Sequence, residues 1–289
     1  MKIQSLSIAV PEKQCINNCK FCCSCMVKEE YRNLIAGNKG EFNNAFNEYI
    51  KKLKFVRSNG CNTVMLTGTS EPQQDYEFLK LFGLMNKMLP DPFINIEMQT
   101  TGVLLDEAYL MFLRDFVGLT TISLSLSSFG NLLNAEINQT SEKLRVNIER
   151  LCHLIKKLGF NLRLSINLTD AFNLYDGEKV FEYCKVLKAD QVTFRVLYKS
   201  NNNTDKDAWI EEHTIDEKVF NSIKLYTIKV GKKLENLPSG AQKYSVDGIT
   251  TVIDTDCMSK KENETYRYLI LRENCKLYSK WDDKGSLIF

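Results

Sequence analysis

The sequence predicts an α/β protein: a partial (β/α)6 TIM-like barrel with a small C-terminal antiparallel β extension. Two observations carry this prediction. Segments with the period of a strand alternate along the chain with longer segments that have the period of a helix. Four consecutive strands also alternate strictly between apolar and polar residues. Because successive strand–helix units wind a parallel sheet in one hand, we expect one sheet, open or partly closed into a barrel.

The six units follow one another from the N-terminus. The first strand covers residues 3–10, and the first clear helix has apolar residues at helical spacing from Phe42 to Val56, with Gly60 beyond its end. The other predicted strands cover residues 63–66, 93–99, 121–127, 162–168 and 191–197. The helices that follow them cover residues 76–88, 106–116, 140–158, 177–187 and 219–230. The helix at 140–158 has the clearest apolar face and stops at a glycine.

The third to sixth strands each have an apolar face and a polar face. In the fifth strand, leucine and isoleucine alternate with Arg163, Ser165 and Asn167. Helices on the apolar side would leave the polar side to line a lumen. A complete barrel normally fills its interior with bulky apolar side chains, so the pattern favours an incomplete barrel that binds a polar molecule. The alternative is that Glu97, Arg163 and Arg195 simply pair with one another inside.

The C-terminal part of the chain changes in character. We expect a barrel domain over residues 1–233 and a β-hairpin cap over residues 234–289, because Asp247-Gly248 is a good hairpin turn between two β-like segments. The cap would carry a set of polar residues and one tryptophan to the barrel mouth: Asp254, Asp256, Cys257 and Trp281. These residues could contact a substrate, but a solvated hairpin around a buried tryptophan is the simpler interpretation.

Composition narrows the class of protein. The 289 residues include 38 basic and 36 acidic side chains, a balance that gives no bulk electrostatic signal for nucleic acid or an anionic membrane. The apolar N-terminal segment ends after about eight residues, which is too short for a signal peptide or a membrane span. We therefore expect a cytoplasmic protein. In that compartment, ten cysteines favour metal binding or reduced thiols over disulfides.

Half of these cysteines lie in one short run after the first strand. Cys15, Cys19 and Cys22 have the spacing CxxxCxxC. Three thiolates on one loop can hold three corners of a 4Fe–4S cluster and leave the fourth iron open to another ligand. Cys23 and Cys25 are expected to be free thiols packed beside the cluster, with a substrate-contacting or redox role as the alternative.

These residues resemble the radical S-adenosylmethionine (radical SAM) superfamily. The resemblance rests on CxxxCxΦC, in which Phe21 is the aromatic residue, and on Gly-Thr-Ser-Glu-Pro at residues 68–72, which looks like the family's GxGEP or GGEP segment. It covers roughly residues 3–200. Ser70 stands where the family usually has a glycine, so a close backbone approach at this point is in question.

The resemblance implies a 4Fe–4S cluster on the three cysteines and S-adenosylmethionine (SAM) on the fourth iron. The cofactor-binding residues that it implies are Phe21, Gly68, Ser70, Glu71, Ser125, Ser127, Arg163 and Asn167. Among them, Glu71 would accept a hydrogen bond from the SAM ammonium, Arg163 would pair with the methionine carboxylate, and Phe21 would shield the adenine. The serines and Asn167 of the lumen would bond to the ribose hydroxyls. Core-lining or internal hydrogen-bonding roles are the alternatives.

The activity implied by the resemblance is reductive cleavage of SAM to a 5′-deoxyadenosyl radical that abstracts hydrogen from a substrate. The substrate is unidentified: an anionic small molecule, a nucleotide and a peptide all stay open, and the lumen arginines hint at an anionic group. A flavodoxin- or ferredoxin-type reductant is the implied partner. The alternative function is a non-catalytic zinc or iron–sulfur protein, in which four of the five clustered cysteines hold structural zinc. Cys257 and Cys275 alone cannot supply an auxiliary cluster.

Overall fold

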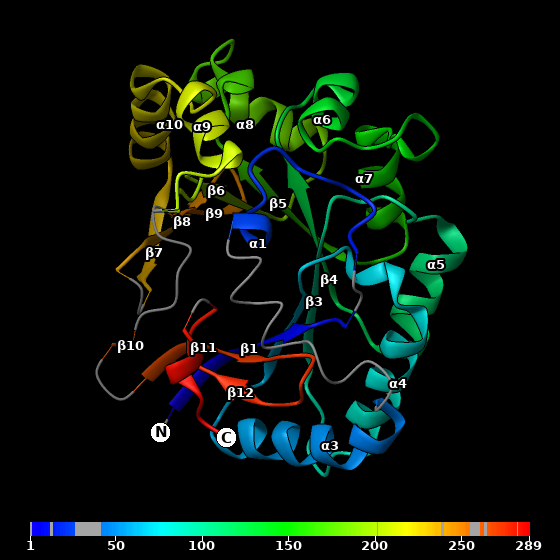
Figure 1. Ribbon diagram of the computed structural model, residues 1–289. Helices are drawn as coiled ribbons and strands as arrows, with labels where there is room; N and C mark the ends of the chain where they lie inside the picture. The colour runs from blue at the N-terminus through cyan, green and yellow to red at the C-terminus, as the bar shows by residue number, and fades with distance from the viewer. Residues whose placement is uncertain are drawn as a thin grey trace.

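A computed structural model describes residues 2–11, 14–26, 42–200, 202–237, 240–254, 261–262, 265–281 and 283–289. Asp256 and Cys257, expected on the C-terminal cap, lie outside the described residues. The described strands join one sheet with a parallel centre and antiparallel strands at both ends. Helices cover its outer face, and the sheet curves without closing (Figure 1). The predicted partial parallel barrel is confirmed.

The parallel part of the sheet comprises, in spatial order, β11 (Thr265–Leu271), β1 (Lys2–Ala9), β2 (Thr63–Thr67), β3 (Asn95–Thr100), β4 (Thr121–Leu126), β5 (Asn161–Asn167), β6 (Gln191–Arg195) and β9 (Ile249–Asp254). Beyond β9, the sheet continues with antiparallel β8 (Gln242–Val246) and β7 (Lys232–Asn236). At the other end, β10 (Lys261–Glu262) and β12 (Leu277–Tyr278) pair antiparallel with β11.

The outer helices are α3 (Phe42–Ser58), α4 (Tyr76–Lys87), α5 (Glu107–Phe112), α6 (Asn131–Ile137), α7 (Ile148–Lys157), α8 (Gly177–Val186), α9 (Asp205–Glu212) and α10 (Glu217–Val230). A π-helical turn, Leu113–Val117, extends α5. Short helical turns cover α1 (Cys23–Met26), η1 (Pro72–Gln74), η3 (Glu142–Leu144), η4 (Asp170–Phe172) and η5 (Lys284–Ser286). Among helices in the described ranges, none combines the length and apolar character that crossing a membrane requires.

One predicted helix is too long, and helix α9 was not predicted. The helix expected at 140–158 begins only at α7, because Asn147 caps it and accepts a hydrogen bond from the N–H of Arg150 at 2.9 Å. The helical spacing of apolar residues continues across this cap, which is why the sequence pattern placed the start of the helix too early. Helix α9 lies where no helix was predicted and begins after Thr204, where Thr204 and Asp207 make a capping box.

The strands divide their side chains between the two faces as predicted. On the outer face, Leu124, Leu164 and Phe194 are fully buried against the helices, and burying each such side chain stabilises the fold by roughly 1.5–3 kcal/mol. On the inner face, the parallel register places Ser123 beside Arg163, and Arg163 beside Gln191. A polar layer therefore lines the lumen.

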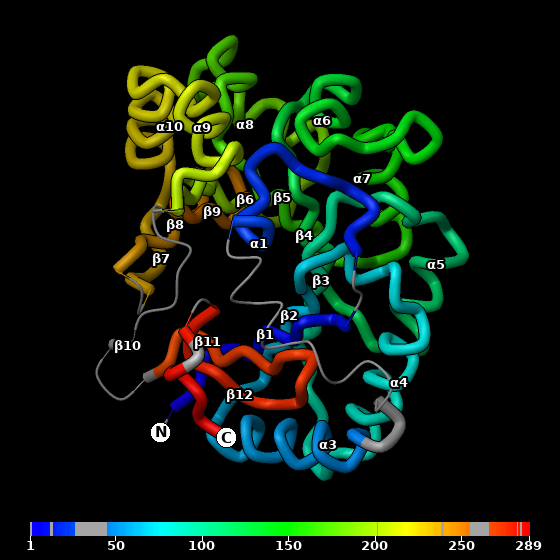
Figure 2. The backbone as a smooth tube through the Cα atoms, in the orientation of Figure 1, coloured from blue at the N-terminus to red at the C-terminus, as the bar shows by residue number. Residues whose placement is uncertain are grey.

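The C-terminal segment belongs to the sheet as well as forming a hairpin. Asp247 and Gly248 both have positive φ, 49° and 86°, at the predicted turn between β8 and β9. β9 then extends the parallel sheet beyond β6, and β11 extends it beyond β1. Figure 2 shows the N-terminal strand lying beside this C-terminal strand. Across the lumen, Asp254 of β9 and Arg267 of β11 form an ion pair at 2.9 Å. Side chains thus bridge the two edges of the parallel part of the sheet.

Candidate functional site

The cysteine loop, residues 14–26, lies at the carboxyl ends of the strands and is held from three sides. From η1, the Gln74 side chain accepts a hydrogen bond from the N–H of Ile16 at 2.8 Å. The N–H of Lys20 donates to the C-terminal carbonyl of α6 at 3.0 Å. From α9, the Lys206 ammonium donates to the carbonyl of Cys19. The loop is therefore preorganised by contacts with elements that are distant in the sequence.

This anchoring brings the predicted cluster ligands into electrostatic contact. Burial raises the pKa of the Cys15 and Cys19 thiols, and the nearby charges of Glu71 and Cys15 raise the pKa of Cys19 further. A hydrogen bond with Cys25, together with burial, raises the pKa of Cys22, and the neighbouring Cys19 thiolate would raise it further. The metal-free thiols are thus neutral, and metal binding must release their protons.

The CxxxCxxC motif of the cysteine loop supplies three thiols, which is the number that a cubane with one open iron takes from the protein. Zinc needs its donors at roughly 2.0–2.3 Å from one point, whereas a cubane takes one thiolate at each of several irons. Three thiols on one anchored loop, once deprotonated, suit three corners of such a cluster.

Glu71, the glutamate after β2, is 5% exposed and uses both carboxylate oxygens inside the protein. Oε1 accepts hydrogen bonds from Thr101 Oγ1 at 2.7 Å and from Asn17 Nδ2 at 3.3 Å. Oε2 accepts from Thr100 Oγ1 at 2.6 Å and from Gln73 Nε2 at 2.8 Å. The Thr101 N–H also donates to this carboxylate. Since a carboxylate has about four lone-pair sites, the predicted contact with the SAM ammonium would have to displace one of these donors.

Two positions before Glu71 differ in their need for glycine. Position 68 requires it, whereas Ser70 takes the place of the family's glycine without strain. Gly68 has φ of 154°, and a Cβ there would lie 3.1 Å from Val10 N. Ser70 is not among the positive-φ residues, so the departure from the family's glycine causes no backbone strain there. Its buried Oγ has no hydrogen-bond partner in the described structure. An orphaned buried hydroxyl costs about 1–3 kcal/mol, and a polar group bound at this point would satisfy it.

The predicted ribose-binding residues come together at the ends of β4 and β5. Asn167 Nδ2 donates to Ser125 Oγ at 3.0 Å and is 3.3 Å from Ser127 Oγ. Asn167 and Ser127 are buried, whereas Ser125 is partly exposed. The structure thus groups these three side chains, and their contact with ribose stays a prediction.

Two other predicted cofactor-binding residues, Arg163 and Phe21, make contacts within the protein, and their contacts with SAM stay predictions. Arg163 was expected to pair with the methionine carboxylate, but its guanidinium pairs with Glu97 at 2.5 Å and donates to Gln191 at 2.9 Å. The alternative, in which Glu97 and Arg163 pair inside the lumen, is confirmed for these two residues. Phe21 packs toward α9, with its ring centroid 6.4 Å from that of Trp209. It lies in a small apolar cluster, and its contact with adenine stays a prediction.

Two residues that organise the loop, Asn17 and Lys206, were not predicted from the sequence. Asn17 is 5% exposed and donates to Thr101 Oγ1 at 2.8 Å as well as to Glu71. Its side-chain oxygen accepts from Thr140 Oγ1 at 3.0 Å. Lys206 reaches the loop from α9. Only the position of Asn17 between two predicted ligands could have suggested its role, and nothing in the sequence marked Lys206.

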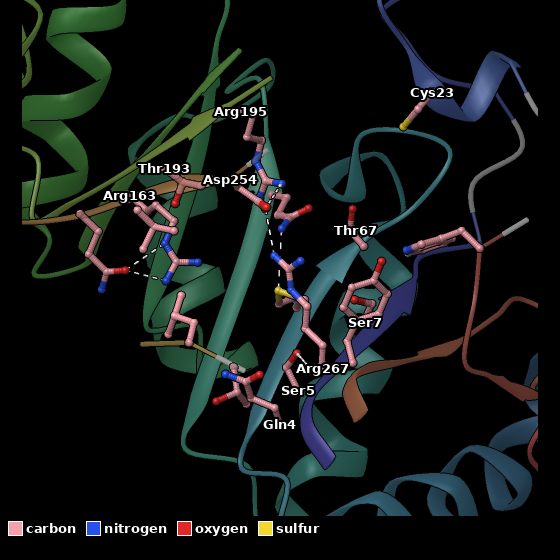
Figure 3. Close-up of a pocket in the computed structure, with 18 of the residues that line it drawn as sticks. Gln4, Ser5, Ser7, Cys23, Thr67, Arg163, Thr193, Arg195, Asp254 and Arg267 are labelled. Carbon is pink, nitrogen blue, oxygen red and sulfur yellow. Dashed lines mark hydrogen bonds and ion pairs between the residues drawn. The ribbon is translucent and has the colours of Figure 1, made fainter. Parts of the chain in front are cut away.

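Below the loop, the lumen contains a cavity of about 570 Å³, within the usual range for small-molecule sites. Gly68, Thr69 and Cys23 line it. Three arginines from separate strands line it as well: Arg163, Arg195 and Arg267. Figure 3 shows Cys23 of α1 near the top of the view, with Arg163 and Arg267 lower down. The predicted polar lumen is therefore a cavity that adjoins the cysteine loop.

No protein-family model matches this sequence, and no curated protein matches it. Solved structures match over most of the chain. SuiB from Streptococcus suis, in a crystal structure with bound S-adenosylmethionine, has a TM-score of 0.59 and 14% identity over 96% of this chain and 60% of its own. A second SuiB crystal structure has a TM-score of 0.60, 13% identity and the same coverage.

The coproporphyrinogen III oxidase HemN from Escherichia coli, described as a radical SAM enzyme, has a TM-score of 0.52 and 13% identity. The match covers 80% of this chain and 54% of HemN. This chain therefore spans at most about three fifths of the length of these proteins. At such identities the likeness establishes the fold alone, which this chain shares with SuiB and HemN. The fold that the sequence resemblance implies is therefore confirmed.

Proposed function

We propose that this chain is a radical SAM enzyme that acts on a substrate held in the lumen. The observation that carries the proposal is the anchored CxxxCxxC loop at the carboxyl ends of a parallel barrel, directly beside a cavity whose wall includes three arginines. The likeness of the fold to SuiB and HemN supports it. When bound, the 4Fe–4S cluster and SAM would supply one-electron cleavage of a carbon–sulfur bond and a 5′-deoxyadenosyl radical for hydrogen abstraction.

The chain's own residues would hold these cofactors and keep water out. Cys15, Cys19 and Cys22 would ligate three irons, because their thiols share one anchored loop. The orphaned Ser70 hydroxyl and the backbone at Gly68 would face the amino-acid part of SAM. Glu71 would serve mainly to fix the loop, because its oxygens already accept five neutral donors.

The inner face of the barrel would orient the remaining parts. Ser125, Ser127 and Asn167 already form a polar group that suits the ribose hydroxyls. Such preorganised groups replace solvent around reactants and need no rearrangement during the reaction.

A flavodoxin- or ferredoxin-type protein would deliver the electron, and a reducing cytoplasm would keep the many thiols free.

The test is anaerobic reconstitution of the full chain with iron and sulfide, followed by addition of SAM and a one-electron reductant. We expect about four irons per chain, a brown protein, and formation of 5′-deoxyadenosine. With cell extract present, deuterium transfer into 5′-deoxyadenosine would identify the hydrogen donor. A colourless protein that holds one zinc after the same treatment would contradict the proposal.

Structural zinc stays the second candidate because of one observation. Cys25, which was expected to be a bystander, hydrogen-bonds with Cys22 and lies in electrostatic contact with Cys15. A fourth thiol is therefore near the three predicted ligands. Cys25→Ser separates the two functions: the cluster requires only three cysteines and would persist, whereas a four-cysteine zinc site would lose a ligand.

A further inference from the structure

The cavity below the cysteine loop contains a pair of guanidinium groups that share one carboxylate. Asp254 Oδ2 lies 2.9 Å from Arg267 Nη2 and 3.7 Å from Arg195 Nη1. The third arginine, Arg163, is occupied by Glu97 and Gln191. Figure 3 shows Arg195, Asp254 and Arg267 meeting in the cavity, apart from Arg163.

Arg195 is the member of this group with donors to spare. Its Nε donates to Ser165 Oγ at 2.6 Å, and its side chain is 28% exposed. In the described part of the chain, its two terminal nitrogens have no acceptor within hydrogen-bond distance, since Asp254 is 3.7 Å away. A guanidinium offers parallel N–H groups that match the two oxygens of a carboxylate or phosphate. A free face of this kind inside a cavity is suited to an oxyanion.

The rest of the cavity wall suits an apolar or planar group. Trp281, Tyr198 and Tyr268 line the same cavity, together with Val252. Aromatic side chains present large, rigid surfaces to a ligand and stack on flat groups. The wall therefore combines an oxyanion-binding arginine with surface for an apolar body.

We propose that Arg195 is a substrate-specificity residue, which binds the carboxylate or phosphate of an anionic substrate whose apolar part contacts Trp281 and its aromatic neighbours. This inference deepens the proposed function and rests on it, because only an enzyme has a substrate. The methionine carboxylate of SAM is the other source of such an oxyanion near the cavity. The substrate is favoured because Arg195 points toward Asp254 and Arg267, whereas the orphaned Ser70 hydroxyl lies on the segment after β2.

The test uses calorimetric titration of the reconstituted full chain with phenylacetate, its neutral amide phenylacetamide, and phenyl phosphate. We expect the amide to bind at least about tenfold more weakly than the better of the two anions, the loss expected for a charged hydrogen bond. Arg195→Gln should weaken binding of that anion about tenfold, and Arg195→Lys should weaken it less. Arg114→Gln, a surface arginine beside Asp115, is the matched control. The SAM dissociation constant should stay within about twofold in all variants.

Equal binding of anion and amide by the wild-type chain, or no binding of any probe, would overturn the inference without reference to any variant. A tenfold loss of SAM affinity in Arg195→Gln, with anion binding unchanged, would overturn it by assigning the arginine to the cofactor. If the chain binds the anions selectively but never cleaves SAM, the oxyanion site stands and the proposed enzyme activity fails. Thermal unfolding of each variant reports whether its fold is intact.

Discussion

The cysteine loop and the arginine-lined lumen adjoin each other, yet different kinds of contact hold them. Backbone groups, polar side chains and the Lys206 ammonium fix the loop. The carboxylate of Glu71 beside it accepts from threonine, asparagine and glutamine. Ion pairs organise the lumen, with Glu97 against Arg163 and Asp254 against Arg267. The loop thus offers three thiols that bind metal once they lose their protons, and the lumen offers charged groups to a charged molecule.

The largest expected effect comes from removing a predicted ligand. Cys19→Ser should abolish cluster assembly, so that iron content and 5′-deoxyadenosine formation fall to background, because two thiolates cannot hold three corners of a cubane. Cys61→Ser is the matched control, since Cys61 is buried between α3 and β2, outside the loop. A Cys19→Ser protein with a full cluster and normal SAM cleavage would show that the loop ligands are misassigned.

Replacing Glu71 should destabilise the region around the cysteine loop and lower its iron content, because Glu71 holds several buried donors there. Glu71→Gln places an NH₂ group against donors such as the Thr101 N–H and the Gln73 amide, and an unsatisfied buried donor costs about 1–3 kcal/mol. We expect a lower melting temperature and a lower iron content, measured against the exposed control Glu182→Gln. Unchanged stability with a large loss of SAM affinity would instead mean that Glu71 binds the SAM ammonium.

Breaking the lumen pair should cost stability and leave the cluster in place. Arg163→Met leaves the buried Glu97 carboxylate unpaired, and loss of a buried partner costs about 3–5 kcal/mol. Because the Arg163 side chain is 27% exposed, we expect about 1–3 kcal/mol by chemical denaturation. Iron content should match that of the wild-type chain. If Arg163→Met lost its cluster while keeping its stability, the separation between loop and lumen would be refuted.

The smallest expected effect is a loss of stability of α9, the helix that carries Lys206, at low pH. Burial alone would raise the pKa of Asp207, but hydrogen bonds from Thr204 and Ser200 outweigh it and lower the pKa to about 2. A carboxyl group with a lowered folded pKa stabilises the fold above its unfolded value, near 3.8, and this stabilisation is lost as the pH falls toward about 2. Amide exchange should show α9 opening in that window, and Lys206 releasing the loop with it. Asp207→Asn should remove this pH dependence, and its persistence there would point to another group.

Local patterns predicted a large part of the site. The spacing of Cys15, Cys19 and Cys22, the glycine at 68 and the alternation along β5 each depend on neighbours in the sequence, and the structure brings them to one place. The pattern could not show that Arg163 would pair with Glu97, because that contact joins β5 to β3 across β4. Lys206 reached the cysteine loop from 187 residues away, and no periodicity carries such information.

Strand period, helix period and motif spacing are properties of adjacent residues, so they were enough to predict the parallel barrel, its polar inner face and the three-cysteine loop after the first strand. The packing of the whole chain decided how the sheet continues past the six units, with β9 and β11 added at opposite edges and Asp254 paired with Arg267 between them. It also decided that Arg195 keeps free donors in the cavity. Hydrogen-bond and ion-pair partners depend on which strands become neighbours, and that choice follows from packing the whole chain.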